Sequence, residues 1–340
     1  MTLADQVVAI PPPPSEADWE RAVALIRDAK RVVLACHVSP DGDALGSTLA
    51  LGIALRRLGL EVIASHDTWP LRTPPSLKFL PGQDLLVAAS SIDFAPDLLM
   101  TFDTGSRDRL GALSALVDSS TDTVVVDHHV TNTCFGSLNL IDVAAASTTV
   151  IVAELLDRLD VEWDAQIATC LYTGLVTDTG SFKYAATTPA VHLLAARLLA
   201  TGIRHDLIAR AVYDTASFGY VKLLGVVLSR TQLDRERNLV WTYVSGADLA
   251  SHGLSLDEVE GIIDVVRLAA EAEVAAVIKQ EPEGAWKVST RSKGEIDVGE
   301  LCQSLGGGGH RFAAGYTSSG ALDETIAELR SALDRLSPTP

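Results

Sequence analysis

The chain has 340 residues, of which 47% are hydrophobic and 21% are charged, and its formal net charge is −17. This length and composition suggest two globular domains with hydrophobic cores. The negative charge argues against a broad basic surface for long DNA or RNA, although divalent cations and a few arginines can create a local site for a small anion.

The N-terminal segment and the cysteines indicate where the protein works. The first residues lack the basic start and apolar core of a signal peptide, and charges interrupt the longer apolar runs before they could span a membrane. Four consecutive prolines at positions 11–14 indicate an extended, disordered leader over residues 1–15. The four cysteines are far apart and form no CxxC pair, which fits a reducing compartment. We therefore expect a cytoplasmic protein without a membrane anchor.

Strand and helix patterns alternate along the next part of the chain. After a helix at residues 15–29, a buried strand at 31–36, a helix at 44–58 and a strand at 61–65 form a βαβ unit, which predicts a parallel sheet. The same patterns continue in further strands and helices, at residues 97–102, 123–126, 147–159, 164–176, 188–199 and 204–211. We expect an α/β domain over residues 16–211, with helices flanking the sheet.

The last third of the chain has a different pattern. A helix at residues 216–229 predicts a helical linker over residues 212–230. Beyond it, TQLDRERNLVWTYV is typical of a hairpin, and a strand pair follows at 274–280 and 285–291. A glycine run and a final helix at 322–336 complete a smaller α/β domain, expected over residues 231–340.

Polar clusters follow three of the predicted strands. HVSPDGD begins at residue 37, DTG at residue 103 and DHH at residue 127. Because the carboxyl ends of parallel strands line one edge of a sheet, these distant segments should meet there. Gly42 lies between Asp41 and Asp43 and indicates a flexible turn that aims both carboxylates inward. A fourth cluster, TDTGSF, closes a helix and could approach from the side.

The residue types in these clusters are those of a two-metal site. Carboxylate and imidazole ligands without thiolates suit Mn²⁺, Mg²⁺, Co²⁺ or Fe²⁺. Clustered carboxylates would repel one another, whereas two divalent ions would neutralise them, activate a water and accept a phosphoryl group. Each motif alone is more often an ordinary turn or a surface histidine. Together they predict a metal-dependent phosphoesterase whose ligands are His37, Asp41, Asp43, Asp103, His128 and Asp178.

These motifs resemble those of the DHH phosphoesterase family, whose eponymous triplet stands here at residues 127–129. The segment RSKGEIDVGELCQSLGGGGHRFAAG, at residues 291–315, resembles the DHH-associated domain. The resemblance implies that two Mn²⁺ ions, replaceable by Mg²⁺ or Co²⁺, are bound and that Asp103 bridges them. The first ion would be held by His37, Asp41 and Asp103, and the second by Asp43, Asp103, His128 and Asp178. His129 would face the substrate or support the ligands, and Asp127 would orient a neighbouring imidazole.

The glycine run suggests a second function for the smaller domain. The backbone amides of residues 306–309 could form an anion-binding nest, with a flexible connector as the alternative. Arg291 and Ser292 are further candidates for phosphate contact, although an ordinary strand end explains them equally well. The substrate-binding residues expected here are Arg291, Ser292, Gly307, Gly308, Gly309, His310 and Arg311.

The layout resembles the compact NrnA-like branch of the family, which degrades very short RNAs and removes the 3′-phosphate from pAp. Some relatives in this branch hydrolyse cyclic di-AMP and pApA, and the sequence ranks none of these substrates above the others. A homodimer is expected by resemblance. One alternative is a family II inorganic pyrophosphatase, whose second domain lacks a GGGGH segment. Another is a nucleotide-binding sensor with structural metals. RecJ-type exonucleases are usually longer and carry extra DNA-binding modules.

Overall fold

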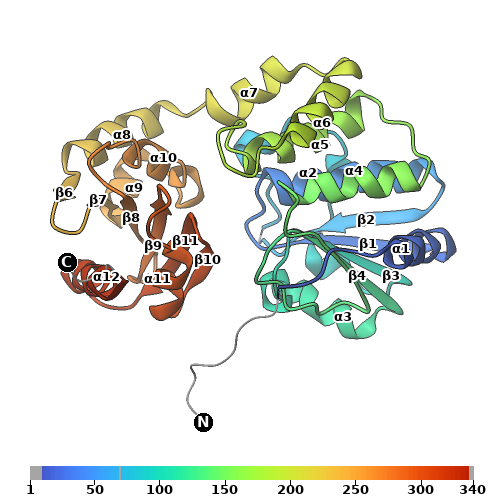
Figure 1. The fold of residues 1–340 in the computed structure, drawn as a ribbon, viewed down its shortest axis with the longest axis horizontal. Helices are drawn as coiled ribbons and strands as arrows, with labels where there is room; N and C mark the ends of the chain where they lie inside the picture. Colours follow the sequence, from blue (N-terminus) through green and yellow to red (C-terminus); the bar gives the residue numbers. More distant parts are fainter. Residues whose placement is uncertain (1–9, 69, 337–340) are drawn as a thin grey trace, which may run out of the picture. The chain divides into compact units, whose positions relative to one another are not determined.

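The computed structural model describes residues 10–68 and 70–336, and the chain divides into two compact units, Met1–Thr215 and Ala216–Pro340 (Figure 1). Residues 1–9 of the expected leader lie outside the described residues. A capping box starts the first helix, because the Ser15 hydroxyl accepts the amide of Asp18 and the Asp18 carboxylate accepts the amide of Ser15.

Five parallel strands form the sheet of the first unit, in the order β2-β1-β3-β4-β5. They are β1 (Arg31–Cys36), β2 (Glu61–Ser65), β3 (Leu98–Phe102), β4 (Asp122–Asp127) and β5 (Leu138–Ile141). The predicted parallel sheet is confirmed. The edge strand β5 was not predicted, because four residues are too short to give a clear periodic pattern.

Helices cover both faces of this sheet. The larger layer contains α1 (Glu16–Asp28), α2 (Gly42–Arg57), α4 (Thr148–Arg158), α5 (Ala165–Asp178), α6 (Pro189–Ala200) and α7 (His205–Tyr213). The opposite face is covered by a 3-10 segment, Arg107–Ala115, and by the short α3 (Leu116–Ser119). Three 3-10 turns lie between β2 and β3, at Pro75–Leu77, Gln83–Leu85 and Ala89–Ser91.

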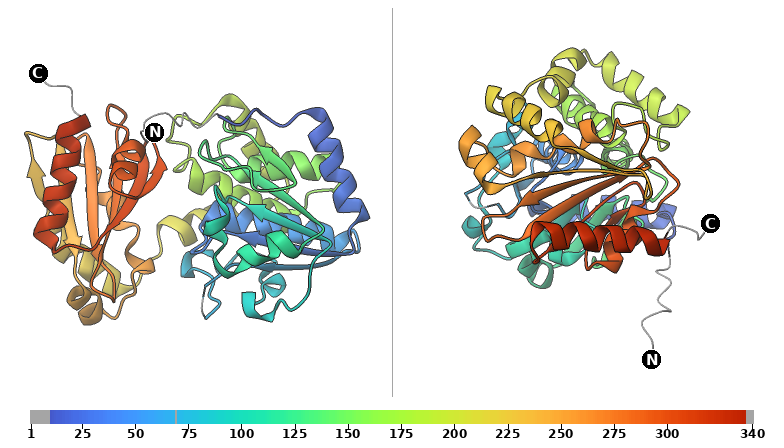
Figure 2. Two further views of the ribbon diagram at one scale, coloured as in Figure 1. Left: turned by 90° about the horizontal axis from the view of Figure 1, so that it is seen from below. Right: turned by 90° about the vertical axis from the view of Figure 1, so that its left-hand side faces the viewer.

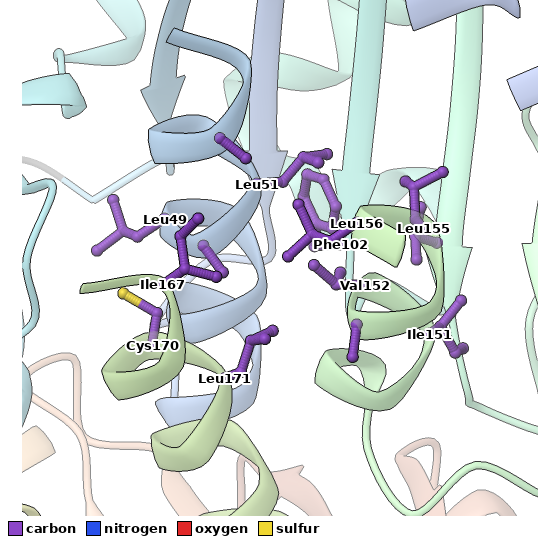
Figure 3. Close-up of a cluster of buried hydrophobic side chains, with 14 of the residues drawn as sticks. Leu49, Leu51, Phe102, Ile151, Val152, Leu155, Leu156, Ile167, Cys170 and Leu171 are labelled. Atoms are coloured by element: carbon purple, nitrogen blue, oxygen red, sulfur yellow. The ribbon is translucent and has the colours of Figure 1, made fainter. Parts of the chain in front are cut away.

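Both faces of the sheet are buried, as parallel sheets require. In β1, Val32 and Leu34 point into the core beneath the larger helical layer, whereas Val33 and Ala35 pack against Leu110 on the other face. Figure 3 shows side chains from α2, β3, α4 and α5 packed together in the larger core. This rigid core fixes the ends of the strands and helices that carry the polar clusters.

Two glycines allow α2 and α5 to pack closely. A methyl group on Gly46 would lie 2.5 Å from the carbonyl oxygen of Cys170, and one on Gly42 would lie 2.5 Å from Oγ1 of Thr177. The flexible turn predicted at Gly42 is wrong, because α2 begins at that residue with Asp41 as its N-cap. Gly42 instead provides room for α5, so that the start of α2 lies beside the end of α5.

The second unit has a six-stranded mixed sheet with the order β10-β11-β9-β8-β7-β6. Its strands are β6 (Gln232–Asp234), β7 (Leu239–Val244), β8 (Val274–Gln280), β9 (Trp286–Ser292), β10 (Gly308–His310) and β11 (Ala313–Ser318). The predicted hairpin forms as β6 and β7, and the predicted strand pair forms as antiparallel β8 and β9. In this sheet β7 and β8 pair in parallel, and the other described neighbours pair antiparallel.

Helices also cover both faces of this second sheet (Figure 2). One layer contains α8 (Phe218–Ser229), α9 (Gly246–His252), a 3-10 turn at Asp257–Val259 and α10 (Ile262–Val266). The other contains α11 (Val298–Ser304) and the predicted final helix, α12 (Leu322–Leu336). The unit therefore has its own hydrophobic core on each side of the sheet.

The helix expected as a linker belongs to the second unit. Leu223 and Val227 of α8 are buried in that unit's core, whereas Val212 of α7 packs on the core of the first unit. The expected linker at 212–230 is thus replaced by the few residues between α7 and α8. In the described part of the chain, no single helix is long and apolar enough to cross a membrane, although α7 and α8, bent by 54°, meet that test as a pair.

Candidate metal centre

Three adjacent strands deliver polar residues to one edge of the first sheet. β1, β3 and β4 are neighbours, and His37, Asp103 and His128 each follow the end of one of them. The chain passes from β1 to β2 on one side and returns to β3 on the other side of β1. Such a reversal of strand order is where ligands commonly bind in open α/β sheets.

A first cluster contains His37, Asp41 and Asp103. The Nε2 atom of His37 lies 3.5 Å from Oδ2 of Asp103 and 4.0 Å from Oδ2 of Asp41. The other ring nitrogen, Nδ1, donates to the carbonyl of Val38 at 2.7 Å, which leaves Nε2 directed at the carboxylates. Asp41 is held in place because its Oδ1 accepts two amides at the start of α2.

A second cluster contains Asp43, His128 and Asp178. The Nε2 atom of His128 lies 3.2 Å from Oδ2 of Asp178 and 3.9 Å from Oδ2 of Asp43. The same nitrogen is 3.5 Å from Oδ1 of Asp103, whose other oxygen faces His37. Asp103 therefore lies between the two clusters, with one carboxylate oxygen toward each.

Asp43 also caps a helix on another part of the chain. Its Oδ2 accepts the amide of Thr148 at 2.6 Å, and its Oδ1 accepts the amide of Thr149 at 2.9 Å. These amides start α4, where the adjacent Ser147 makes no side-chain cap. The Thr148 hydroxyl donates to Asp103 at 3.2 Å. This role of Thr148 and Thr149 was not predicted, although Ser-Thr-Thr before an apolar helix is a capping signal.

The charges of this site match those of a cation-binding centre. In the described part of the chain, the ion pairs of Asp43, Asp103 and Asp178 come from histidines, not from Lys or Arg. Burial, together with the Asp103 charge, raises the pKa of Asp43 to about 7, and burial beside Asp43 raises the pKa of Asp178. These carboxylates repel one another and have only histidines as positive partners among the described ion pairs. Divalent cations bound between them would offset this repulsion.

The pKa of Asp103 shifts in the opposite direction from the pKa values of Asp43 and Asp178. Burial alone would raise its pKa, but hydrogen bonds from His128 and His37 hold the pKa of this carboxyl well below its usual value. Burial would lower the pKa of His37, yet Asp103 and Asp41 raise it to about 9. The Asp103 carboxylate is therefore ionised, and each of its oxygens can interact with a positive partner.

A separate chain of hydrogen bonds orients His129. Its Nδ1 donates to Oδ1 of the fully buried Asp127 at 2.7 Å, and Asn132 donates to the other carboxylate oxygen at 2.6 Å. Asn132 also donates to the carbonyl of Thr104 at 3.1 Å, which fixes it to the turn after β3. Asn132 was not identified from the sequence, although its position five residues after Asp127 places it in the same loop.

The candidate substrate-binding residues of the second unit form hydrogen bonds with other groups of the same unit. Arg291 lies near the end of β9 and donates to the carbonyl of Thr290 at 2.9 Å. Ser292 is 3% exposed, and its hydroxyl donates to Glu273 at 2.8 Å, so this group is already engaged within the fold. Arg311 is exposed and donates to the carbonyl of Gly294 at 3.3 Å.

The glycine run is ordered, and part of it closes a helix. The amides of Gly306 and Gly307 donate to Gln303 and Cys302 at the end of α11, and the next residues form β10 against β11. A methyl group on Gly307 would lie 2.1 Å from the carbonyl oxygen of Gly315. The expected four-amide nest is therefore wrong for its first two residues, and a flexible connector is also wrong. Gly308 and Gly309 remain exposed on the edge strand, beside His310.

Comparison with known proteins identifies the family to which the chain belongs. Residues 31–175 match the family model described as DHH family, N-terminal domain, and residues 238–336 match the DHHA1 domain. The chain is 35% identical over 337 residues to the bifunctional oligoribonuclease and PAP phosphatase NrnA of Thermus thermophilus, a match that covers 95% of this chain and 97% of that protein. The chain therefore belongs to the DHH family and is a phosphoesterase.

Other relatives and solved structures agree with this assignment to the family. It is 26% identical over 306 residues to the NrnA protein of Bacillus subtilis, which covers 88% of this chain and 94% of that protein. A solved exopolyphosphatase-related protein from Bacteroides fragilis has a TM-score of 0.87 at 26% identity and covers 94% of this chain and 96% of that chain. RecJ of Thermus thermophilus, with a TM-score of 0.59 at 16% identity, shares the fold over 99% of this chain and 57% of that chain.

Proposed function

We propose that this chain is a two-metal hydrolase of short nucleotides, which removes the 3′-phosphate of PAP and shortens very short oligoribonucleotides from the 5′ end. The observation that carries the proposal is the position of Asp103, whose two oxygens face the two clusters of possible ligands. The relatives named as oligoribonuclease and PAP phosphatase supply the substrate class.

The six clustered side chains would hold two divalent cations, with Mn²⁺ as the proposed metal and Mg²⁺ or Co²⁺ as substitutes. His37, Asp41 and Asp103 would form one site, and Asp43, Asp103, His128 and Asp178 the other. When bound, the cations would supply an activated water and offset the charge of the phosphoryl oxygens.

His129 is the proposed proton donor. Because Asp127 accepts the proton of Nδ1, the other ring nitrogen, Nε2, is the atom that would protonate a leaving oxygen. Burial lowers the pKa of His129, but the hydrogen bond and charge of Asp127, together with the charge of Asp103, raise it overall. Asp127 would thus keep the ring oriented, and Asn132 would keep Asp127 in place.

The second unit is proposed to bind the phosphate and base of the nucleotide. Arg291, His310 and Arg311 carry the side chains suited to phosphate, with the exposed Gly308 and Gly309 alongside them. Ser292 is left out of this set, because its hydroxyl is buried against Glu273.

Cyclic di-AMP and its product pApA are a second candidate substrate pair. The chain is 27% identical to the cyclic-di-AMP phosphodiesterase GdpP of Geobacillus thermodenitrificans, over 91% of this chain but only 48% of that protein. That relative is much longer, so this substrate ranks behind PAP and short RNA.

We further propose that the enzyme works in the cytoplasm as a homodimer. The described cysteines are all free, and three of them are buried, as expected in a reducing compartment. Sedimentation velocity of the full chain would test the dimer, which a single monomeric species at working concentration would exclude.

The proposed activity is tested by comparing substrates on one preparation. With Mn²⁺ present, the full chain should release phosphate from PAP and mononucleotides from a short RNA, at kcat/KM values well above those for pyrophosphate. Tight nucleotide binding without turnover would instead support a sensor. Hydrolysis of pyrophosphate alone would support the pyrophosphatase alternative.

A further inference from the structure

A ring of donors in the second unit surrounds a single carboxylate oxygen. Oε1 of Glu273, the residue before β8, accepts the Ser292 hydroxyl at 2.8 Å and the amide of Gly294 at 2.8 Å. The same oxygen accepts the amides of Glu295 at 2.7 Å and Lys293 at 3.1 Å, and that of Ile296 at 3.3 Å. The loop after β9 is thus wrapped around a side chain from the start of the neighbouring strand.

Consecutive amides that converge on one point form the kind of nest that usually binds a phosphate or another anion. Here a carboxylate of the chain itself occupies the nest. Gly294 has a φ of +136°, a backbone conformation in which a side chain would be strained, and it allows the loop to turn its amides inward. The nest therefore serves the fold, and its occupant is fixed by several bonds at once.

The same loop is connected to both arginines proposed to bind phosphate. Arg291 directly precedes it, and Ser292 donates its amide to the carbonyl of Phe312 at 3.0 Å. Arg311 donates its side chain to Gly294 at 3.3 Å and accepts the amide of Val298 at its own carbonyl, 3.0 Å away. Removal of the Glu273 side chain would take away the acceptor that these five donors share, although the amide of Lys293 would keep the Glu273 carbonyl and that of Gly294 the Ser292 hydroxyl.

We propose that Glu273 is a positioning residue for nucleotide binding, which fills the nest of residues 292–296 and thereby holds Arg291 and Arg311 where they meet the substrate phosphate. This assignment rests on the proposed function of the second unit. Glu273 would touch no substrate itself, so its loss should weaken binding more than it slows the chemical step.

The test is a kinetic comparison of full-length variants with PAP and Mn²⁺. Glu273→Ala should raise KM about tenfold or more while kcat changes much less, as for other residues that orient binding groups. Glu273→Gln keeps an oxygen that can accept the same amides, so it should restore most of the lost affinity. Glu271→Ala is the matched control. Glu271 is an exposed glutamate two residues earlier, and its substitution removes the same charge.

A double-mutant cycle shows whether Glu273 acts through the arginine. If it does, Glu273→Ala should add little to the KM of an Arg311→Ala variant. Fully additive effects, or a Glu273→Ala variant whose KM stays within about twofold of the wild type, would overturn the assignment. Should the alanine variant fail to fold, Glu273→Asp, which withdraws the carboxylate from the nest, replaces it with the same expectation.

The activity of the wild-type protein distinguishes a failure of the proposed function from a failure of the role assigned to Glu273. A wild type that turns over no nucleotide refutes the proposed function and the role of Glu273 with it. An active wild type whose Glu273→Ala variant keeps its KM refutes the role of Glu273 alone.

Discussion

At the scale of single residues, Asp103 adopts a backbone conformation that few side chains tolerate. Its φ is +53°, in the left-handed region, which costs about 1–2 kcal/mol for a residue with a Cβ atom. The turn directs its carboxylate back over the sheet edge, where His37 and His128 lie on either side. Strain of this kind persists where the surrounding fold holds a reactive group in one position.

Asp103→Asn should therefore affect both proposed ion sites at once. The amide cannot supply the negative charge that two cations share, so we expect kcat for PAP to fall on the order of 10²–10³-fold or more. Asp108→Asn, an exposed aspartate of the same connection, should leave the rate unchanged. An Asp103→Asn variant with near-normal turnover would show that this carboxylate does not bridge two metals.

His129 and Asp127 should behave as one unit. His129→Ala should lower kcat about 10²-fold or more, because the proposed proton donor is lost. Asp127→Asn should lower it as well, and should add little once His129 is absent. Measurement of kcat and Mn²⁺ affinity on the single and double variants would check this. Losses confined to Mn²⁺ affinity would show that the pair supports the ligands instead.

At the scale of elements, the contact between α2 and α5 brings together carboxylates from distant parts of the sequence. Gly46→Ala would place a methyl group against the Cys170 backbone, which cannot move aside easily. We expect a loss of about 1–3 kcal/mol in the free energy of unfolding, accompanied by weaker Mn²⁺ binding. Denaturant unfolding with and without Mn²⁺ would measure both effects.

Gly225→Ala supplies the control for this prediction. Gly225 lies within α8, and a methyl group there would meet no atom within 4 Å. This change should stabilise the protein by about 0.5–1 kcal/mol through helix propensity alone. A Gly46→Ala variant as stable as Gly225→Ala would mean that the α2–α5 contact does not need the glycine.

Single strands could be predicted from the sequence, whereas contacts between distant elements could not. Apolar runs predicted β1, β3 and β4, and the rule for strand ends then predicted that His37, Asp103 and His128 would be neighbours. The cap that Asp43 forms on α4 depends on a contact across more than a hundred residues, which no local pattern contains. The glycine at 307 was misread for a related reason, because the backbone that crowds it comes from β11.

At the scale of the whole molecule, a strongly acidic chain concentrates four carboxylates at one sheet edge. Bound divalent cations would relieve their repulsion in the folded state only, so metal should stabilise the fold. Treatment with a chelator should lower the melting temperature by about 5–10 °C, and Mn²⁺ should restore it. A melting temperature that is the same with excess chelator and with Mn²⁺ would argue against a metal centre of this kind.

The central feature of the proposed site is a pair of ions acting together at the edge of the first sheet. The most direct measurement is a calorimetric titration of chelator-treated protein with Mn²⁺, with PAP hydrolysis assayed at each point. We predict two ions bound per chain and full activity only when both sites are filled. Full activity in excess chelator, or with a single ion per chain, would contradict the two-metal assignment.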